Sequence, residues 1–470
     1  MSKIQKHMFE QVRTSVLLKQ ACKSALEYQT DTDEKAIYPS NKDLDLLSAF
    51  DGDLPENIGD ANALLNLLAN QGAQNTVRYS NGRYYGFVNG SALPIGLAAK
   101  WLADVWDQNA ALFVMSPIAA KLESVCQQWL QQLFQLTENT VAGLVGGTSV
   151  ASLCGLAAAR YRQLTHLGWD IAQHGLFAAP ALRIILAKQT HGTVVKMLNL
   201  LGFGQQQIEW VECDEQGRMR VDAIPPLDHS CILVLQAGNV CSGAFDDFQT
   251  IIPKAQAAKA WVHVDGAFGL WAAASAKFNE LTKGVNLANS WSVDGHKTLN
   301  APYDCGIILC ADPKALTQAL HQQGSYIQTS ENRDNMIFTP DMSRRARGIE
   351  LWACLAYLGK NGIAELVELL HQHAVYFAKN IRIAGFKVLN DVVFNQVIIC
   401  ADSDEITVNT LKAIQNSGVT WCGGATWMGR KVIRISICSW ATTETEIDKS
   451  IAVFSECLDK HIQLANGVYK

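Results

Sequence analysis

Short apolar runs alternate with helical patterns through the middle of the chain. The runs lie at Arg183–Ala187, Cys231–Leu235, Trp261–Val264 and Gly306–Cys310. Each has the length of a strand and is apolar on both faces, which is typical of the strands of a buried parallel sheet. Helical segments between several of these runs indicate βαβ units. We therefore expect a large α/β domain that is built on a mostly parallel sheet.

The pattern changes on both sides of this middle region. Before it, Ile95–Leu136 predicts long amphipathic helices with a break at Ser116-Pro117. After it, we expect a helix over Ile363–Ala378 and then short strands near Phe386–Leu389, Asn395–Cys400 and Val432–Ile437. The chain is predicted to have three parts, namely an N-terminal helical segment (1–94), the large domain (95–360) and a smaller α+β C-terminal domain (361–470).

Composition and charge narrow the class of protein. Of the 470 residues, 49% are hydrophobic and 18% are charged, which fits a well-packed globular protein. The net charge is −5 without any Lys/Arg block, so neither nucleic acid nor a membrane surface is an expected partner. The 13 cysteines form no C-x-x-C pair, which argues against a metal site and favours reduced thiols. With no signal-peptide core and no spanning segment, we expect a cytoplasmic protein that acts on a small molecule.

Polar residues follow the predicted strands where each strand ends. His191 follows Ala187, Asn239 follows Leu235 and Asp265 follows Val264, while Lys297 comes after the short run Ser290–Val293. In open α/β sheets, ligands bind outside the carboxyl ends of the strands, because loops and helix N-termini converge there. These polar residues are therefore expected to share one site.

Two of these residues suggest chemistry, and each also has a structural explanation. Lys297, in Asp294-Gly295-His296-Lys297, could be desolvated enough to lose its proton and form an imine, or it could be a lysine that extends to solvent. Asp265 shares a strand face with His263 and could hold a protonated ring nitrogen, or it could cap the following turn.

Two further segments are open to the same two kinds of interpretation. Gly146-Gly147-Thr148-Ser149 precedes a helix of small residues and suits a phosphate dianion, although a simple N-cap would have the same sequence. It lacks the pattern of a Walker loop. His191 could stack on an aromatic ring and move protons, or it could be a solvated loop histidine.

Taken together and in this order, the segments resemble the group II family of pyridoxal-phosphate-dependent amino-acid decarboxylases. The resemblance extends from about Tyr84 to Thr443. It is carried by Tyr85-Gly86-Phe87, Thr190-His191, His263–Ala267, Ser292–Lys297, Tyr303-Asp304-Cys305, Ser343–Arg347 and Arg434-Ile435-Ser436. The family includes decarboxylases for glutamate, diaminobutyrate, cysteine sulfinate and aromatic amino acids.

The resemblance implies a fold and an activity. The fold is the fold type I of PLP-dependent transferases, with a mostly parallel seven-stranded sheet in the large domain and a smaller α+β C-terminal domain. The activity is decarboxylation of an L-amino acid to its amine and CO2, with pyridoxal 5'-phosphate held as a Schiff base on Lys297. The family also implies a homodimer in which the partner chain completes each active site. Which amino acid is the substrate does not follow from these motifs.

The resemblance also implies roles for individual residues. Lys297, His191 and Asp265 are the expected catalytic residues: the lysine binds the cofactor and returns a proton to the substrate, the imidazole stacks on the ring, and the carboxylate pairs with the ring nitrogen. Phe87 and Asn89 match a substrate-lining segment, and Arg434 binds the substrate carboxylate or forms a structural salt bridge. The other residues expected around the cofactor are Thr148, Ser149, Asp294 and His296 at the phosphate, Ala267 beneath the ring and Asn239 near the ring oxygen.

The chain departs from the family pattern at two places. A loop tyrosine often protonates the α-carbon in this family, but residues 328–342 contain no tyrosine, and Tyr326 lies just before them. Transamination, aldehyde-forming oxidative deamination or a non-catalytic PLP-binding role are therefore alternatives to decarboxylation. In addition, Asp294 stands where relatives often have a neutral residue, and a carboxylate repels a phosphate unless it points away or pairs with a cation.

Overall fold

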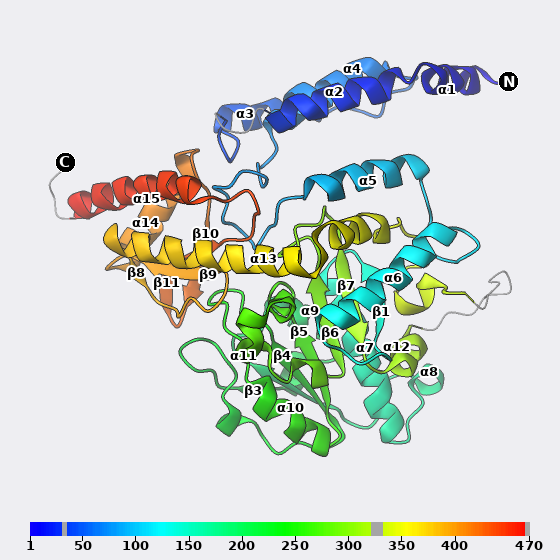
Figure 1. Cartoon of the computed structure of the whole chain (residues 1–470), viewed down its shortest axis with the longest axis vertical. Coiled ribbons are helices and arrows are strands. Elements are labelled where there is room, and N and C mark those ends of the chain that lie inside the picture. The colour runs from blue at the N-terminus through cyan, green and yellow to red at the C-terminus, as the bar shows by residue number, and fades with distance from the viewer. Residues whose placement is uncertain (31–34, 321–331, 466–470) are drawn as a thin grey trace.

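A seven-stranded sheet forms the centre of the molecule (Figure 1). The computed structural model describes residues 1–30, 35–320 and 332–465. The strand order is β1-β7-β6-β5-β4-β2-β3. The strands are β1 (Val141–Val145), β2 (Arg183–Ala187), β3 (Ile208–Val211), β4 (Cys231–Gln236), β5 (Trp261–Asp265), β6 (Ser290–Asp294) and β7 (Gly306–Cys310).

The sheet is mostly parallel, as predicted, but one strand runs the other way. Strands β3, β2, β4, β5 and β6 pair in parallel, whereas β7 is antiparallel to both β6 and β1. The prediction that Gly306–Cys310 is a parallel strand is therefore wrong. Residues 295–305 join β6 to β7 without a helix, and a parallel return normally needs a crossover of about a dozen or more residues, usually a helix.

Both faces of the large sheet are buried. Ile232 and Val234 belong to one hydrophobic cluster, whereas Leu233 and Leu235 on the same strand belong to another on the opposite face. This explains why the strand segments read as continuous apolar runs. The helices of this domain are α6 (Pro117–Leu133), α7 (Thr148–His166), α8 (Ile171–His174), α9 (Gly192–Leu200), α10 (Phe248–Ala257), α11 (Asn279–Thr282), α12 (Pro313–Ala319) and the start of α13 (Gly348–Ile383).

Helix α7 packs unusually close to the sheet because its inner face is made of small residues. A Cβ atom on Gly155 would lie only 2.7 Å from the imidazole of His263 on β5. At the start of the same helix, a Cβ on Gly306 would lie 2.3 Å from the Cα of Gly147. These close approaches fix the N-terminus of α7 at the carboxyl edge of the sheet.

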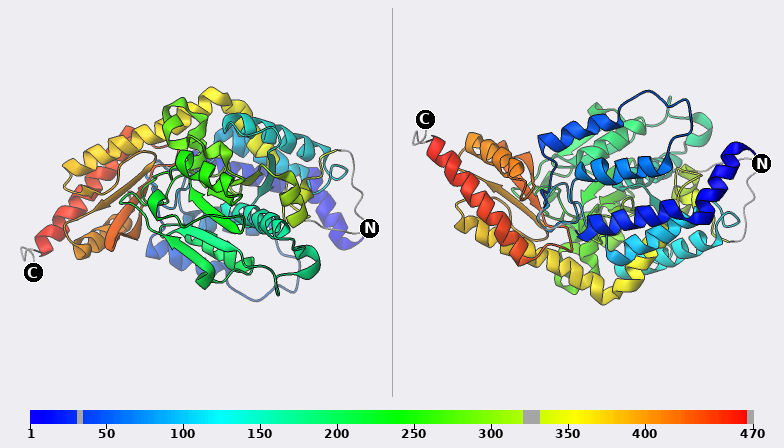
Figure 2. Two further views of the ribbon diagram at one scale, coloured as in Figure 1. Left: turned by 90° about the horizontal axis from the view of Figure 1, so that it is seen from below. Right: turned by 90° about the horizontal axis from the view of Figure 1, so that it is seen from above.

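Helix α13 leads from the large sheet to the small C-terminal domain, which lies at one end of the molecule (Figure 2). Gly359 interrupts this helix with a φ of 59°. The small sheet has the antiparallel order β10-β11-β9-β8. The remaining elements are β8 (Lys387–Val388), β9 (Gln396–Cys400), α14 (Asp404–Asn416), β10 (Gly423–Trp427), β11 (Arg430–Ser436) and α15 (Glu444–Ala465). The domain boundaries at 94/95 and 360/361 stay predictions.

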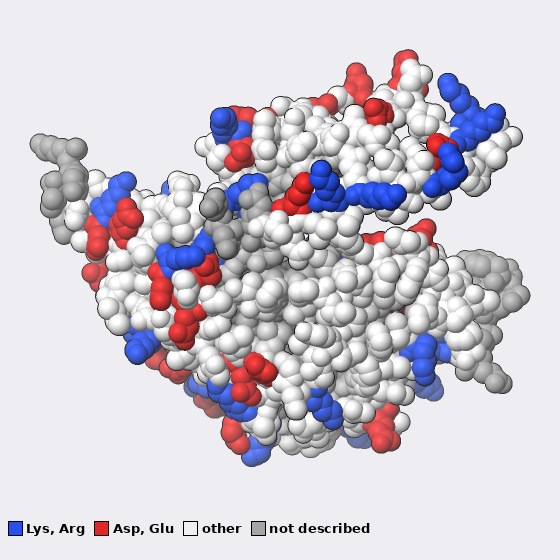
Figure 3. Space-filling view, turned by 45° about the horizontal axis from the view of Figure 1, so that its top comes forward, with Lys and Arg blue, Asp and Glu red and all other residues white. Residues whose placement is uncertain are grey.

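The N-terminal helices form an arm that stands apart from the body (Figures 1 and 3). The arm consists of α1 (Lys3–Thr14), α2 (Val16–Thr30), α3 (Asn41–Asp45) and α4 (Ala61–Leu67), and α5 (Pro94–Trp106) lies on the body beneath it. On the face in Figure 3, basic and acidic side chains are interspersed. Among the described helices, none combines the length and the apolar character needed to cross a membrane.

Candidate active site

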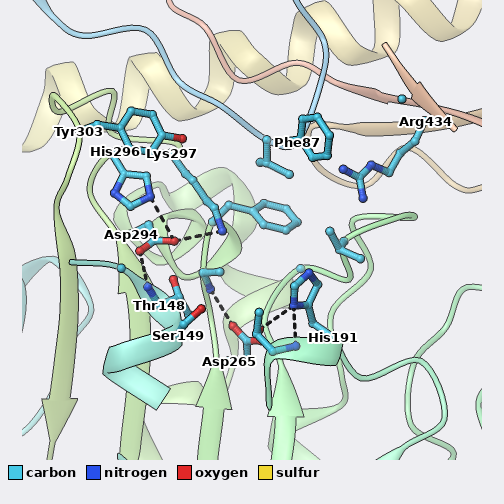
Figure 4. Close-up of a pocket in the computed structure, with 18 of the residues that line it drawn as sticks. Phe87, Thr148, Ser149, His191, Asp265, Asp294, His296, Lys297, Tyr303 and Arg434 are labelled. Carbon is cyan, nitrogen blue, oxygen red and sulfur yellow. Dashed lines mark hydrogen bonds and ion pairs between the residues drawn. The ribbon is translucent and has the colours of Figure 1, made fainter. Parts of the chain in front are cut away.

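A cavity of about 710 Å³ opens at the carboxyl edge of the parallel strands. It lies between the end of β5, the end of β6, the start of α7 and strands β10 and β11 of the small domain (Figure 4). This is the position where open α/β sheets bind ligands. Ten of the twelve predicted site residues line it: Phe87, Thr148, Ser149, His191, Asp265, Ala267, Asp294, His296, Lys297 and Arg434.

The other two predicted site residues, Asn239 and Asn89, are not part of the lining. The Asn239 amide joins two loops: its Oδ1 accepts the N–H of Cys241 in its own turn at 2.9 Å, and its Nδ2 donates to the carbonyl of Gln189 after β2 at 3.3 Å. Asn89 accepts a hydrogen bond from the Tyr303 hydroxyl at 2.8 Å. The structure therefore assigns both amides to the support of loops around the cavity.

Lys297 lies in the loop that follows β6, where several contacts hold it. Its Nζ lies 3.0 Å from Oδ2 of Asp294, and its carbonyl accepts a hydrogen bond from the Asn300 amide at 3.1 Å. A Cβ on Gly90 would lie 2.3 Å from that same carbonyl oxygen, so the segment around residue 90 packs directly on the lysine backbone. The amine is thus fixed at one wall of the cavity (Figure 4).

Asp265 ends β5 and is buried, with 7% of its surface exposed. One carboxylate oxygen accepts the N–H of Ala267 at 3.2 Å. Burial raises the pKa of Asp265, while the neighbouring His191 and Lys297 oppose that rise. A desolvated carboxylate of this kind is stabilised by a cationic N–H that enters the cavity.

His191 is the N-cap residue of α9. Its Nδ1 accepts the N–H of Thr193 at 3.3 Å and lies 2.7 Å from that residue's hydroxyl. Desolvation in the cavity lowers the pKa of His191, and the charges of Lys297 and Arg434 act in the same direction against the attraction of Asp265. The imidazole is therefore mainly neutral at pH 7.

The N-terminus of α7 has the donors that a phosphate ester needs. The Thr148 hydroxyl is buried and has no hydrogen-bond partner within the described residues, and Ser149 lines the cavity beside it. The dipole of this 19-residue helix adds to their attraction for an anion. These groups fit the phosphate of pyridoxal phosphate, and the cavity volume lies in the usual range for a cofactor site.

His296 and Tyr303 form the wall next to this helix end. The two rings stack with centroids 4.2 Å apart. Nδ1 of His296 accepts the N–H of Cys305 at 3.0 Å, so in the neutral ring the proton is on Nε2, which lies 3.6 Å from Oδ2 of Asp294. Tyr303 belongs to a motif of the family resemblance, but nothing in its sequence context indicated a place in the site.

The far wall of the cavity is aromatic and comes partly from the small domain. The ring of Trp421 stacks on Phe87 at 5.5 Å and on Tyr84 at 5.3 Å. Phe87 and Val88 have φ values of +52° and +62°, in the left-handed region that non-glycine residues rarely adopt. Strain of this kind at a cavity wall is typical of functional sites. Sequence reasoning missed Trp421, because nothing local to it indicates a contact with residues more than 300 positions earlier.

Arg434 on β11 points into the cavity beside this aromatic wall (Figure 4). Within the described chain, no carboxylate forms an ion pair with it, so the salt-bridge explanation is not supported there. The two acidic residues of the lining, Asp265 and Asp294, belong to the opposite side of the site. Arg434 is therefore available to an anionic group of a ligand.

The tyrosine-free stretch 328–342 lies partly outside the described residues, and so does Tyr326. Its one aromatic residue, Phe338, is buried against the large sheet and does not line the cavity. In the described part of the chain, no group of three or more His, Cys, Asp or Glu side chains is arranged to hold a metal ion.

Known proteins resemble this chain along most of its length. The family model described as "Pyridoxal-dependent decarboxylase conserved domain" matches residues 69–400. An aromatic-L-amino-acid decarboxylase of Bacillus atrophaeus is 25% identical over 418 residues, which are 84% of this chain and 85% of that protein. Acidic amino acid decarboxylase GADL1 of Xenopus tropicalis is 25% identical over 334 residues, 67% of this chain and 63% of that protein. The crystal structure of Oryza sativa TDC with PLP and tryptamine superposes with a TM-score of 0.87 at 21% identity, covering 96% of this chain and 98% of that one.

Proposed function

This chain belongs to the family of pyridoxal-dependent decarboxylases, and from this premise we propose that it converts an L-amino acid to its amine and CO2 with Lys297 as the residue that binds the cofactor. One observation carries the proposal. One cavity brings together a lysine amine, the buried carboxylate of Asp265 and, at a helix N-terminus, the Thr148 hydroxyl, which has no hydrogen-bond partner among the described residues.

Besides Lys297, four residues of the chain would hold the cofactor. When bound, pyridoxal phosphate supplies a conjugated ring that accepts the electron pair left on the α-carbon as CO2 departs. Asp265 would keep the ring nitrogen protonated, because its own buried charge is stabilised by a cationic N–H. Thr148 and Ser149 would hold the phosphate at the start of α7, and His191 would cover one face of the ring.

Lys297 is the better candidate for returning the proton to the α-carbon. The lowered pKa of His191 leaves its imidazole mainly neutral at pH 7, so it is a poor proton donor in that state. The Lys297 amine lines the cavity and lies 3.0 Å from Oδ2 of Asp294, a carboxylate that would stabilise a proton on it. We therefore assign the proton transfer to Nζ of Lys297.

Charge and shape narrow the substrate. Arg434, which has no carboxylate partner in the described part of the chain, would bind the carboxylate of the amino acid. Phe87 and Trp421 offer a flat apolar surface beside it, which favours an aromatic side chain. The carboxylates of the lining, Asp265 and Asp294, lie on the cofactor side of the cavity. Among the described lining residues, no other carboxylate could pair with a positively charged substrate side chain, which argues against diamino acids.

A product assay on a substrate panel tests this function. The full chain with pyridoxal phosphate is expected to release CO2 and amine in equal amounts. Its kcat/KM should be at least about tenfold higher for an aromatic amino acid than for 2,4-diaminobutyrate. The reason is that burying an unpaired charge in the pocket costs more than about 1.4 kcal/mol. The panel includes tyrosine, tryptophan, phenylalanine, glutamate, aspartate and diaminobutyrate.

The products separate the alternatives. A keto acid would indicate transamination, and an aldehyde with peroxide would indicate oxidative deamination. A PLP-loaded protein that turns over no member of the panel would favour a non-catalytic role. Preference for diaminobutyrate would contradict the substrate class alone, since the reaction would still be a decarboxylation.

We further propose that the chain is a homodimer, as the family resemblance implies. Helices α1, α2 and α4 have no buried residue, yet they carry exposed apolar side chains such as Phe9 and Leu64. Helix α5 beneath the arm likewise exposes Trp101 and Leu102. Short helices need tertiary packing to be stable in water, and apolar surface of this extent is typical of an interface.

Light scattering after size exclusion tests the oligomeric state. The full chain has a mass of 51.5 kDa, so the peak is expected at about twice that value at micromolar concentration, because obligate homodimer interfaces bury a large apolar area. Replacing Trp101 and Leu102 together with glutamate should shift the peak towards the monomer. A monomeric wild-type protein with full activity would contradict the proposal.

A cytoplasmic location fits the cysteine chemistry. The 13 cysteines are free thiols in the structure, and most of them are buried. A chain with this many unpaired thiols is typical of a reducing compartment.

A further inference from the structure

Asp294 places a carboxylate inside the cradle that a phosphate would occupy. The residue ends β6 and is 2% exposed. Its Oδ1 accepts the N–H of Thr148, the first residue of α7, at 2.7 Å. Its Oδ2 lies 3.0 Å from Nζ of Lys297. The carboxylate therefore connects the end of the helix dipole to the amine of the site (Figure 4).

The charged and titratable groups around Asp294 leave it with one strong counter-charge. His296 is the nearest imidazole at 3.6 Å, but burial lowers the pKa of that ring and keeps it mainly neutral. Asp265 and Tyr303 also interact electrostatically with Asp294, and neither is a cation. Within the described residues, Lys297 is thus the only full positive charge that pairs with this carboxylate.

A phosphate dianion at the start of α7 would meet this carboxylate. Two anionic groups would then share one helix N-terminus, and like charges in a desolvated site repel each other. The amine of Lys297 must also leave its ion pair and be neutral before it can attack an aldehyde. Asp294 would therefore lose the positive charge of Lys297 when the phosphate, a second anion, has to be held beside it.

We propose that Asp294 weakens the hold of this chain on its cofactor, by stabilising the cofactor-free site and by opposing the phosphate. The inference rests on the proposed function, because it assumes that the phosphate lies at Thr148 and Ser149. Within the described residues, the Thr148 hydroxyl has no hydrogen-bond partner, so the cradle retains attraction for a phosphate and the cofactor would still bind. Asp294 sets how tightly it binds, and it is a positioning residue rather than a catalytic one.

The test compares two aldehydes on the cofactor-free full chain. In an Asp294→Asn variant, the amide oxygen can still accept the Thr148 N–H, but the negative charge is gone. We expect the Kd for pyridoxal phosphate to fall by at least about tenfold, the change that corresponds to about 1.4 kcal/mol of relieved repulsion. Pyridoxal lacks the phosphate and its repulsion from Asp294. The Kd for pyridoxal should therefore fall by less than about threefold.

Asp312 provides a matched control. It also caps a helix, accepting the N–H of Ala315 at 2.9 Å, and it pairs with Arg162, but it does not line the cavity. Asp312→Asn should leave both dissociation constants unchanged. Thermal unfolding gives a second measurement: inorganic phosphate should raise the Tm of cofactor-free Asp294→Asn by more than it raises that of the wild type.

Two results would overturn the inference: an unchanged or weaker affinity of Asp294→Asn for pyridoxal phosphate, or an equal change for both aldehydes. If the asparagine variant does not fold, Asp294→Ser gives the same comparison, because its hydroxyl is also an uncharged acceptor. Failure of the proposed function would be recognised separately in the product assay, because a wild-type chain that binds pyridoxal phosphate but releases no CO2 would contradict decarboxylation and leave this comparison of affinities intact.

Discussion

A Lys297→Ala variant is expected to lose the visible absorption band of the bound cofactor. Its kcat/KM for decarboxylation should fall by at least about 1,000-fold. The loss is large because one side chain supplies two functions. Its amine is the group that condenses with the cofactor, and it is also our candidate for the proton donor. Absorption spectra and initial rates on the preferred substrate measure the two losses in one preparation.

A second lysine controls for the loss of an ion pair. Lys387 pairs with Asp402 at 2.7 Å on the small domain, and Lys387→Ala should keep both the band and the rate. Lys297→Ala leaves the buried Asp294 without its cation, so a lower Tm is expected as well. A small primary amine added to the solution should restore part of the turnover. The assignment of Lys297 would be wrong if the alanine variant kept more than about a tenth of the wild-type rate, since another group would then have to supply its functions.

The parts of the fold that follow from local patterning could be predicted from the sequence. Cys231–Gln236 and Trp261–Asp265 are apolar on both faces because both sides of the sheet are covered. Strand β3 was not predicted, because it has four residues and its Trp210 is exposed at the edge of the sheet. The direction of β7 was missed for another reason, since direction depends on the connection rather than on the strand itself.

The residues of the candidate site likewise divide into those that local sequence patterns predict and those that depend on the path of the chain. Asp265 and Lys297 could be predicted because the topology of a parallel sheet brings its strand ends together. Trp421 could not, because it reaches the cavity only through the path of α13 and the small domain. Asn239 follows a strand end as predicted, but its amide hydrogen bonds go to Cys241 in its own turn and to Gln189 in the neighbouring loop. Position along a strand therefore does not determine where a side chain points in the following loop.

Asp265→Asn is expected to retain the absorption band of the bound cofactor while kcat falls by about 1,000-fold, a loss of the size seen when one preorganised electrostatic group is removed. The amide has the shape of the carboxylate and keeps the oxygen that accepts the Ala267 N–H. What it lacks is the charge that keeps the ring nitrogen protonated. The band and the rate should therefore separate in this variant, whereas Lys297→Ala loses both.

A second buried carboxylate at the same edge of the sheet is the matched control. Asp246 accepts the N–H groups of Met219 and Gln236, each at 2.7 Å, and burial raises the pKa of Asp246 to about 6. It does not line the cavity. Asp246→Asn should lower the Tm without a comparable loss of kcat for the folded protein, which separates the chemical role of Asp265 from the general cost of removing a buried carboxylate.

A cofactor analogue tests the physical reason for the loss in Asp265→Asn. N-methylpyridoxal phosphate has a permanently positive ring nitrogen, so it does not need a carboxylate to keep that charge. If Asp265 acts by maintaining the positive charge, the analogue should raise the kcat of the variant by at least about tenfold. The reason is that the electron sink no longer depends on a proton. It should give no comparable gain to the wild type. A variant that loses activity and gains nothing from the analogue would show that Asp265 acts through the geometry of the loop at Ala267 instead.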